Sequence, residues 1–401
     1  MANLEERTRA PSLDIDIFSE AYLSDPVRHY DAIRDAGPVV FLSKYGVYGV
    51  TRHAEVMATL KDFDSFCNGR GGTMTDLAKE SGWRKPSLLV ENDPPQHQHL
   101  RAMMNRVVSL QDLKGRRASW EEQANRLIAD AAARRHIDAV PDIAQAYPMM
   151  IFPNLIGVAS EGREMMLTYS AALFNSIAPD TELFRRSSAA AVTAIEWVAN
   201  ACRRENLSDG GWGLKVFEAA DQGLCTEEEA EQLVRSFVSA GVDTTVNAIG
   251  SLILALARAP DQWQLLRANP SLAKRAVEES LRLDSAVQGF FRTTTREVEV
   301  SGTWLPEGAK VYLFLGVANR DPRRWDDPDK FEVMRNCSGH VAFGFGIHQC
   351  LGQMVARLEA EVILDALLRQ VSEIRLTADP VPGLNNAVRG FHSLPVELVP
   401  A

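Results

Sequence analysis

One cysteine in a glycine-rich loop constrains this chain more than any other feature. The loop reads FGFGIHQCLG from Phe343 to Gly352, with Cys350 near its end. Glycine lacks a Cβ, so the backbone here can take positive φ and approach a flat ligand closely. Apolar residues recur at helical spacing from Leu351 onward, which places the sulfur just before a helix start, where the helix dipole favours a thiolate. We therefore expect Cys350 to ligate haem iron.

Two other interpretations of this loop compete with haem ligation. A buried structural cysteine in a Gly-rich turn is the common case for an arbitrary chain. A zinc site would use His348 and Cys350, but the sequence places no second Cys or His pair at metal-ligand spacing nearby. Three glycines, an aromatic residue and a histidine surround Cys350, and this complete pattern favours haem ligation over both alternatives.

The cysteine loop resembles that of the cytochrome P-450 family. The shared residues are Phe343, Gly344, Gly346, His348, Cys350 and Gly352. The resemblance covers nearly the whole chain and implies a mainly α fold with small peripheral β-sheets. It also implies that haem b lies between a long distal helix and the helix that follows the cysteine loop.

Composition indicates the class of protein and its surroundings. No linker or repeat divides the 401 residues, so we expect a single domain over residues 1–401. The net charge of −10 argues against nucleic acid or an anionic membrane as a partner. The stretch MANLEERTRAPSLDIDIF is charged throughout, and the five scattered cysteines suit a reducing compartment. We expect a soluble, monomeric, cytoplasmic protein.

Periodicity divides the chain into helical and extended parts. Helical spacing dominates from about Pro95 to Leu283. Strand patterns are confined to residues 39–50, residues 298–317 with a turn at Pro306-Glu307-Gly308, and residues 393–399. The sheets are therefore expected to be minor and peripheral.

The apolar helix predicted from Leu233 to Gly250 carries Asp243 and Thr244 in its middle. One explanation is structural: Thr244 bonds to the carbonyl four residues earlier and Asp243 forms a salt bridge. Gly241 costs about 1 kcal/mol of helix stability relative to alanine, and with a back-bonding Thr it permits a local opening that can receive dioxygen. The A-G-x-D-T-T pattern resembles that of the P-450 family, which implies that Asp243 relays protons, Thr244 holds the hydrogen-bond network, and Ala240 and Gly241 border the haem.

Haem propionates need cationic or hydrogen-bonding partners. His97 and Arg101 are four apart in a helix predicted to start after Pro95, so they share a face. Each could equally be a solvated basic residue. The family resemblance implies that both bind propionates, together with Arg292 and His340.

Glu279 and Arg282 share a helix face at a three-residue offset, which alone is a weak signal because surface pairs contribute little. The resemblance implies that Arg335 completes a triad with them. Val333 and Met334 depart from the proline expected in that segment. The implied role of the triad is folding and haem retention.

The predicted distal helix suggests a small substrate. Ser236 and Thr244 lie on one stripe, eight residues and about 12 Å apart along the helix. That separation, shortened by side chains, suits a compact ring better than a steroid or a fatty chain. Arg84 and Ser87 precede the His97 helix, and an arginine beside hydroxyl groups is a good carboxylate clamp.

Four longer strings narrow the resemblance to the bacterial 4-methoxybenzoate monooxygenases of this superfamily. They are WRKPSLLVENDPP, LVRSFVSAGVDTTVN, VQGFFRTTTREVEV and LNNAVRGFHSLPV. The resemblance implies that the substrate carboxylate is held by Arg84, Ser87, Arg235 and Ser236. It implies that the ring packs against Val90, Phe174, Ala240, Val287 and Phe290. Ile177 stands where a second aromatic residue is expected, which loosens that wall and affects the preferred substituent.

The resemblance implies a haem-thiolate monooxygenase that activates O2 with two electrons from a ferredoxin and its NAD(P)H-dependent reductase. Hydroxylation of the methoxy carbon of 4-methoxybenzoate gives a hemiacetal, which collapses to 4-hydroxybenzoate and formaldehyde. The residues expected to dock an acidic ferredoxin are Arg101, Arg106, Lys114, Arg116, Arg117 and Arg357.

Three alternatives remain. A peroxygenase of the same fold would use hydrogen peroxide, but Asp243 and Thr244 argue for dioxygen activation. A haem-thiolate sensor would bind carbon monoxide without turnover. An oxidase of another small aromatic compound, or of a larger biosynthetic substrate, differs only in pocket size, which periodicity does not determine.

Overall fold

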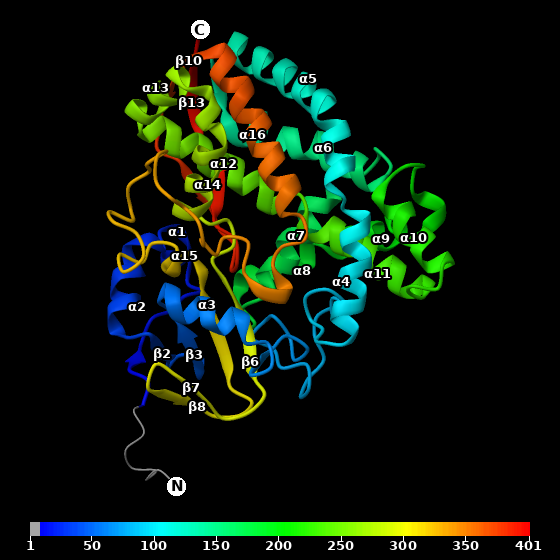
Figure 1. Cartoon of the computed structure of the whole chain (residues 1–401), viewed down its shortest axis with the longest axis vertical. Coiled ribbons are helices and arrows are strands. Elements are labelled where there is room, and N and C mark those ends of the chain that lie inside the picture. The colour runs from blue at the N-terminus through cyan, green and yellow to red at the C-terminus, as the bar shows by residue number, and fades with distance from the viewer. Residues whose placement is uncertain (1–8) are drawn as a thin grey trace.

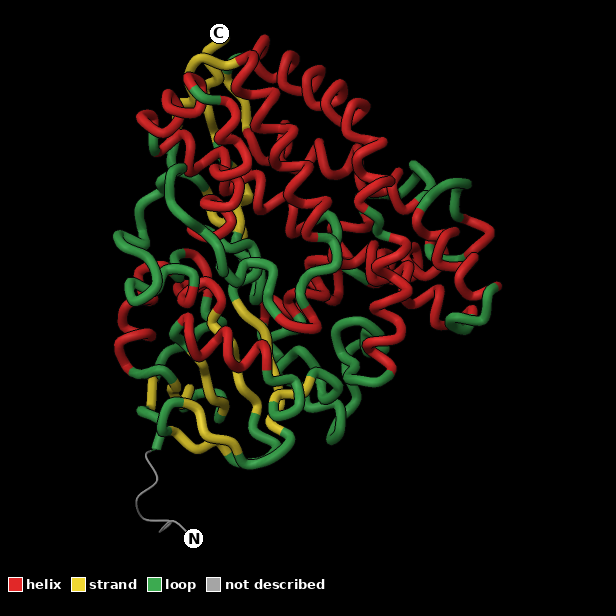
Figure 2. Tube along the Cα trace, viewed as in Figure 1, coloured by secondary structure: helices red, strands yellow, loops and turns green. Residues whose placement is uncertain are grey.

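Helices make up the upper and right-hand parts of the molecule in Figure 1, and the main sheet lies at the lower left. The secondary-structure colouring in Figure 2 shows the same division. The structure is a computed structural model that describes residues 9–401. The expected mainly α fold with small β-sheets is confirmed. Of the N-terminal stretch discussed above, residues 1–8 lie outside the described residues.

The helical block begins directly after Pro95, as expected, and is interrupted by a short strand at residues 136–138. Helices α5 (Leu110–Arg134) and α11 (Glu227–Ala240) start at side-chain caps: Ser109 accepts from the Asp112 N–H, and Thr226 forms a capping box with Glu229. The helices are α1 (Glu20–Ser24), α2 (Tyr30–Ala36), α3 (His53–Lys61), α4 (Gln96–Val107), α5 (Leu110–Arg134), α6 (Ala146–Ile156), α7 (Met165–Asn175), α8 (Glu182–Ala190), α9 (Val192–Ala201), α10 (Trp212–Asp221), α11 (Glu227–Ala240), α12 (Asp243–Arg258), α13 (Pro260–Ala268), α14 (Ala273–Leu283), α15 (Leu315–Ala318) and α16 (Gln353–Gln370).

The main sheet has six strands in the order β1-β2-β3-β9-β6-β4. A second sheet has the order β10-β13-β5, and β11-β12 and β7-β8 form two hairpin-like pairs. The strands are β1 (Ser12–Leu13), β2 (Val39–Leu42), β3 (Val47–Val50), β4 (Phe66–Cys67), β5 (His136–Asp138), β6 (Gly289–Thr294), β7 (Val298–Val300), β8 (Thr303–Leu305), β9 (Lys310–Phe314), β10 (Val371–Leu376), β11 (Val381–Gly383), β12 (Gly390–Ser393) and β13 (Pro395–Pro400).

The strand predictions were incomplete: β1, β4, β5, β10, β11 and most of β12 lie outside the predicted ranges. The strand predicted to reach residue 317 ends at Phe314, and the chain continues directly into α15. Strand β6 was absent from the predicted strands, because nearly all of its residues are buried and its sequence therefore does not alternate between apolar and polar. It pairs with β9 from Gly289 to Thr293 and carries Phe290 and Arg292 toward the centre of the molecule.

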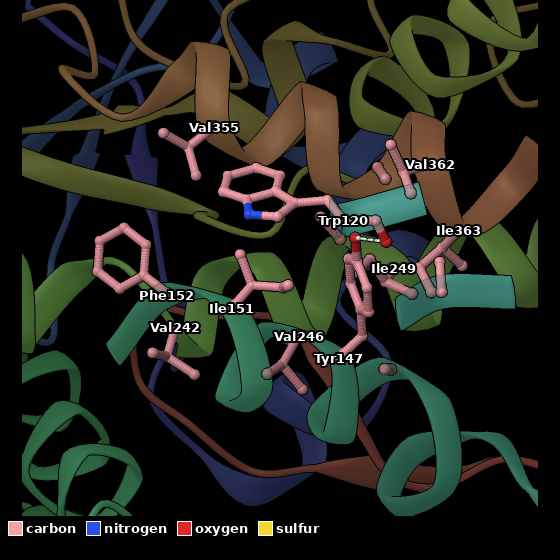
Figure 3. Packing of buried hydrophobic residues seen from close by; sticks show 14 of the residues in the cluster. Trp120, Tyr147, Ile151, Phe152, Val242, Val246, Ile249, Val355, Val362 and Ile363 are labelled. Atoms are coloured by element: carbon pink, nitrogen blue, oxygen red, sulfur yellow. Dashed lines mark hydrogen bonds between the residues drawn. The ribbon is translucent and has the colours of Figure 1, made fainter. Parts of the chain in front are cut away.

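The hydrophobic core lies where α5, α6, α12 and α16 meet. Figure 3 shows Trp120, Tyr147 and Ile249 close together within this cluster. The Tyr147 hydroxyl donates to the Trp120 carbonyl at 3.0 Å, which satisfies a polar group in an apolar layer. Val362 and Ile363 of α16 close the cluster from the other side.

The expected long distal helix is two helices, because the α-helical pattern stops between Ala240 and Asp243. The predicted local opening is therefore present. A Cβ on Gly241 would lie 1.9 Å from Cε1 of Phe152, so glycine also allows the Phe152 ring to pack directly on the helix backbone. Figure 3 labels Phe152 of α6 and Val242, the residue that follows Gly241.

The span of residues 227–258 has the length and mean hydropathy, 1.4, of a membrane-crossing helix. In the fold it is an interior element, and 61% of its most apolar window is buried. Its apolar character is accounted for by core packing.

Candidate active site

A cavity of about 360 Å³ lies between the α11–α12 break and the loop before α16. Ala240 and Thr244 line one wall, and Phe343 and Cys350 line the opposite wall. The remaining walls come from the segment before α4, from α7 and from β6. The two sequence regions that were predicted to face each other are thus brought together around one space.

Cys350 is placed by its own loop. Its N–H donates to the Phe343 carbonyl at 2.9 Å, and the Gly352 and Gln353 N–H groups donate to the sulfur. Burial is the strongest influence and raises the pKa of the Cys350 thiol, whereas these amides and the Arg101 charge act in the opposite direction. A bound metal ion would decide the balance in favour of the thiolate.

Two glycines of the cysteine loop, Gly344 and Gly346, have positive φ but different surroundings. Gly344 (φ +67°) lines the cavity, and a Cβ there would meet no atom closer than Cζ of Phe290 at 3.9 Å. Gly346 (φ +75°) does not line the cavity, because its backbone approaches α3, where a Cβ would lie 2.6 Å from the Leu60 carbonyl. Packing against α3 therefore requires glycine at position 346, and the contact of Gly346 with haem that the family resemblance implies stays a prediction.

Arg292 is buried beside the cavity and lacks a carboxylate partner within residues 9–401. It donates to the Phe291 carbonyl at 3.0 Å and lies 4.4 Å over the Phe290 ring. Burial lowers the pKa of Arg292 to about 9. Arg101 also lines the cavity and donates to the Gln349 carbonyl at 2.5 Å. A buried and a half-buried cation that line one cavity call for an anionic ligand.

Two histidine rings pack together near the cavity, and one of them, His348, lines it. His97 and His348 are 4.1 Å apart between ring centroids, and neither nitrogen of His97 has a partner among the described residues. Burial lowers the pKa of both rings, that of His348 to about 3, so both are neutral at pH 7. A neutral ring can still donate one N–H to an anionic group.

His340 is placed differently from the prediction. Its Nε2 lies 2.8 Å from Glu278 Oε2, and Arg357 pairs with the same carboxylate at 2.5 Å. Neither His340 nor Glu278 lines the cavity. The expected contact of His340 with a propionate is therefore not supported, because a protein carboxylate already holds its ring.

The polar residues at the helix break use backbone groups freed there. The Thr244 hydroxyl donates to the Ala240 carbonyl at 3.0 Å, as expected for a back-bonding threonine. Asp243 has no salt bridge within the described chain. Instead, Asn247 Nδ2 donates to its carbonyl at 2.8 Å and to its Oδ1 at 3.3 Å. Burial raises the pKa of Asp243 to about 6, although the Asn247 bond opposes this shift.

Most of the residues predicted to contact substrate line the cavity. They are Arg84, Val90, Phe174, Ile177, Ser236, Ala240, Val287 and Phe290. Ser87 and Arg235 do not line it. The Ser87 hydroxyl accepts from the Leu89 and Val90 N–H groups at 3.3 Å, and Arg235 reaches the Lys85 carbonyl at 3.4 Å. Of the four residues predicted to hold the substrate carboxylate, Arg84 and Ser236 therefore line the cavity, and the other two do not.

Comparisons with known proteins identify the family. Residues 214–380 match the family model described as Cytochrome P450. The protein named Cytochrome p450 CYP199A2 from Rhodopseudomonas palustris is 48% identical over 392 residues, which cover 98% of this chain and 95% of that protein. The chain belongs to the cytochrome P450 family.

Solved cytochrome P450 structures share the fold. That of CYP109Q5 from Chondromyces apiculatus has a TM-score of 0.82 at 28% identity and covers 97% of this chain and 99% of its own. That of CREJ in complex with (4-ethylphenyl) dihydrogen phosphate has a TM-score of 0.86 at 26% identity and covers 94% and 98%. The expected P450 fold is confirmed.

A cytochrome P450 carries haem b on a cysteine thiolate, and the cavity residues fit that group. Of the five cysteines, Cys350 is the one that lines the cavity. The buried charge of Arg292, the cation of Arg101 and the partnerless nitrogens of His97 suit two propionates. Within residues 9–401 no group of three or more His, Cys, Asp or Glu residues forms a metal cluster, so the zinc interpretation gains no support.

The triad predicted for this P450 is assembled below the cysteine loop. Arg282 pairs with Glu279 at 2.7 Å with both side chains fully buried, and Arg335 Nε lies 2.9 Å from Glu279 Oε1. Arg335 also donates to the Asp327 carbonyl at 3.0 Å. The unexpected Val333 and Met334 do not prevent this arrangement.

The positive face predicted for a redox partner is mostly neutralised in this P450. Arg116 pairs with Asp112, Arg117 with Glu121, Glu361 and Asp365, and Arg357 with Glu278. Arg101 points into the cavity. Arg106 and Lys114 alone among the six predicted residues are exposed and form no ion pair with another described residue. The sequence did not reveal this pairing, because the partner carboxylates come from neighbouring turns of α5 and from the helices α14 and α16.

Sequence reasoning missed several residues that line the cavity of this P450. Phe152 and Leu173 come from α6 and α7, and Thr245 follows Asp243 and Thr244, the two residues predicted to be catalytic. Glu91 lies within a string that resembles the family but carried no predicted role. Thr245 could have been found from the doubled threonine, whereas Phe152 has no local signal, because its position depends on packing against Gly241.

Proposed function

We propose that this cytochrome P450 monooxygenase oxidises a small para-substituted aromatic acid, with O-demethylation of 4-methoxybenzoate as its main reaction. The observation that supports the proposal is the polarity of the cavity. Arg84 and Ser236 line the cavity, and so do the apolar side chains of Phe174, Val287 and Phe290. A carboxylate at Arg84 would direct the opposite end of a benzene ring toward the haem face.

A relative in the fold supports this substrate class. The structure of CREJ holds (4-ethylphenyl) dihydrogen phosphate, a para-substituted ring with an anionic group at its other end. A carboxylate on a para-substituted benzoate has the same layout. Ile177 in place of an aromatic residue gives this cavity more room beside the ring than an aromatic residue would leave.

The protein residues have separate tasks in this reaction. When bound, haem supplies the oxidising power that, with O2, two protons and two electrons, converts a methoxy group into a phenol, formaldehyde and water. Arg84 and Ser236 orient the acid, and Phe174, Val287 and Phe290 exclude water from the ring. Asp243 has a pKa of about 6, so it can take up and release a proton near neutral pH, and Thr244 directs that proton into the cavity.

Electrons come from a partner protein in this proposal, a ferredoxin with its NAD(P)H-dependent reductase. Arg106 and Lys114 give the exposed cationic contact on the α4–α5 side. We further propose a soluble, monomeric enzyme of the cytoplasm. The acidic net charge of −10 and the interior position of residues 227–258 support this placement.

A binding experiment tests the substrate class. The ferric protein is titrated with 4-methoxybenzoate, 4-methoxybenzamide and anisole while the low-spin to high-spin Soret shift is followed. The acid should bind at least about tenfold more tightly than either neutral compound, because hydrogen bonds to charged groups contribute about 1.5–3 kcal/mol. Equal affinities would refute the carboxylate clamp. Formation of formaldehyde and 4-hydroxybenzoate with a reconstituted ferredoxin system then tests turnover.

A further inference from the structure

A second cavity of about 490 Å³ adjoins the active-site cavity. Trp83, Phe184 and Met74 line this outer cavity. Thr73, Arg84 and Glu91 line both cavities. The two spaces therefore meet at the side chains of Arg84 and Glu91, which occupy the boundary between them.

An ion pair closes that boundary. Arg84 Nη1 lies 2.9 Å from Glu91 Oε2, and the two side chains are 19% and 6% exposed. The same Glu91 oxygen accepts from the Ser87 N–H at 2.8 Å, and Arg84 Nη1 also donates to the Lys85 carbonyl at 2.8 Å. Arg84 Nε is buried and has no partner within the described chain. The guanidinium thus retains an unused donor while its charge is neutralised by Glu91.

Glu91 is the one carboxylate among the described residues that line the inner cavity, where Arg84, Arg101 and Arg292 supply the cations. The outer cavity contains two further carboxylates, Glu80 and Asp180. Asp180 pairs with Arg185 at 2.9 Å. Glu91 is therefore the acid that competes directly with an incoming anion for Arg84.

We propose that Glu91 is a latch that an aromatic carboxylate opens. The acid enters through the outer cavity, and its carboxylate replaces Glu91 Oε2 on Arg84, while Glu91 keeps the Ser87 N–H. An acid exchanges one charged hydrogen bond for another, whereas a neutral compound must separate Arg84 from Glu91 without replacing their bond, so an acid opens the boundary more readily. Because Glu91 is tethered beside Arg84, it competes at a high effective concentration and weakens the affinity for every acid.

The latch rests on the proposed aromatic-acid substrate. The main variant is Glu91→Gln, which keeps the shape of the side chain and its acceptor for Ser87 but removes its charge. Glu80→Gln is the matched control, because it removes the same charge from the outer cavity and leaves the Arg84 pair intact. The ferrous carbon monoxide spectrum reports that haem is held equally in all three proteins.

The first measurement is the Soret spin-state titration. Glu91→Gln should bind 4-methoxybenzoate roughly tenfold more tightly than the wild type, which corresponds to exchanging a charged competitor for a neutral one. Its affinity for 4-methoxybenzamide should change by less than about twofold. An unchanged or weaker affinity for the acid, or an equal gain in Glu80→Gln, would overturn the latch.

The second measurement needs no aromatic acid. Stopped-flow mixing with imidazole, which binds the haem iron, reports access through the boundary. The association rate should rise about fivefold in Glu91→Gln and stay at the wild-type value in Glu80→Gln. If no benzoate shifts the spin state of any variant, the proposed substrate class is wrong. The imidazole association rates then test the latch by themselves. Equal rates in the wild type and Glu91→Gln would refute it.

Discussion

Asp243 and Thr244 lie at the start of α12, where the distal helix is interrupted. The Thr244 hydroxyl satisfies the Ala240 carbonyl, and Thr245 reaches the Gly241 carbonyl at 3.4 Å. Two carbonyls at the break thereby accept hydrogen bonds from hydroxyl groups, and both threonines line the cavity. One short sequence pattern, from Ala240 to Thr245, thus contains both the interruption of the helix and the polar residues that hydrogen-bond there.

Replacing Asp243 with asparagine should slow substrate oxidation by about 100-fold, because a positioned acid–base group typically contributes that much or more. The amide keeps the size of the side chain and still bonds to Asn247, so the spin-state shift with 4-methoxybenzoate and the ferrous carbon monoxide spectrum should match the wild type. NAD(P)H-driven product formation is the measurement. A wild-type rate in this variant would remove Asp243 from the proton path.

The residues that could be predicted are those marked by local patterns. Cys350, Gly241 and Thr244 each belong to a short motif whose spacing alone indicates their chemistry. Glu91 could not be predicted, because its role depends on which side chain it faces across a turn. His340 was misplaced for the same reason, since Glu278 approaches it from α14.

Helix α16 carries a buried acid, Glu359, nine residues after Cys350. Its side chain is fully buried, and neither oxygen has a hydrogen-bond partner within residues 9–401. Burial raises the pKa of Glu359 to about 8. The folded protein therefore holds a proton here that the unfolded chain releases above its ordinary pKa of 4.5.

The free energy of unfolding should consequently fall as pH rises from about 4.5 to about 8 and level off above that range. One proton contributes at most about 1.4 kcal/mol per pH unit. The Glu359→Gln variant, which cannot ionise, should lose this part of the slope and should be more stable than the wild type at pH 8. Thermal unfolding midpoints of both proteins at pH 6 and pH 8 measure the effect. Parallel pH dependence in the two proteins would show that Glu359 is not the titrating group.

Elements differ in how well periodicity predicts them. The amphipathic helices, the β2–β3 hairpin and the break at Gly241 follow from local spacing and propensity. Strand β6 does not, because a strand buried on both faces lacks the alternating pattern. The missed strand matters for function, because Phe290 and Arg292 of β6 both line the cavity.

At the scale of the whole molecule, exposed positive charge on the α4–α5 side is sparse. Most of the basic residues there are paired with acids, and Arg106 and Lys114 remain exposed. If an acidic ferredoxin docks on this side, these two charges supply much of the long-range attraction. The distribution of unpaired charge on the surface could not be inferred from residue counts, because it depends on which basic residues form ion pairs in the fold.

Reversing both charges, as Arg106→Glu with Lys114→Glu, should lower the rate of the first electron transfer from ferredoxin by about tenfold or more at low ionic strength. The difference should shrink at high salt, where the Debye length is short. Arg28→Glu is the control, since Arg28 lies between α1 and α2, on the other side of the molecule from α4 in Figure 1. Stopped-flow reduction under carbon monoxide measures the rates, and equal rates in all variants would place the docking site elsewhere.

The buried guanidinium of Arg292 also links folding to cofactor supply. No protein carboxylate among the described residues forms an ion pair with it, although Asp93 acts on it from a distance, and a haem propionate is the group that fits beside it. A ligand that binds only the folded chain stabilises it in proportion to the logarithm of its free concentration. The yield of folded enzyme in a cell should therefore follow haem biosynthesis, with the cofactor acting as the counterion that completes the core.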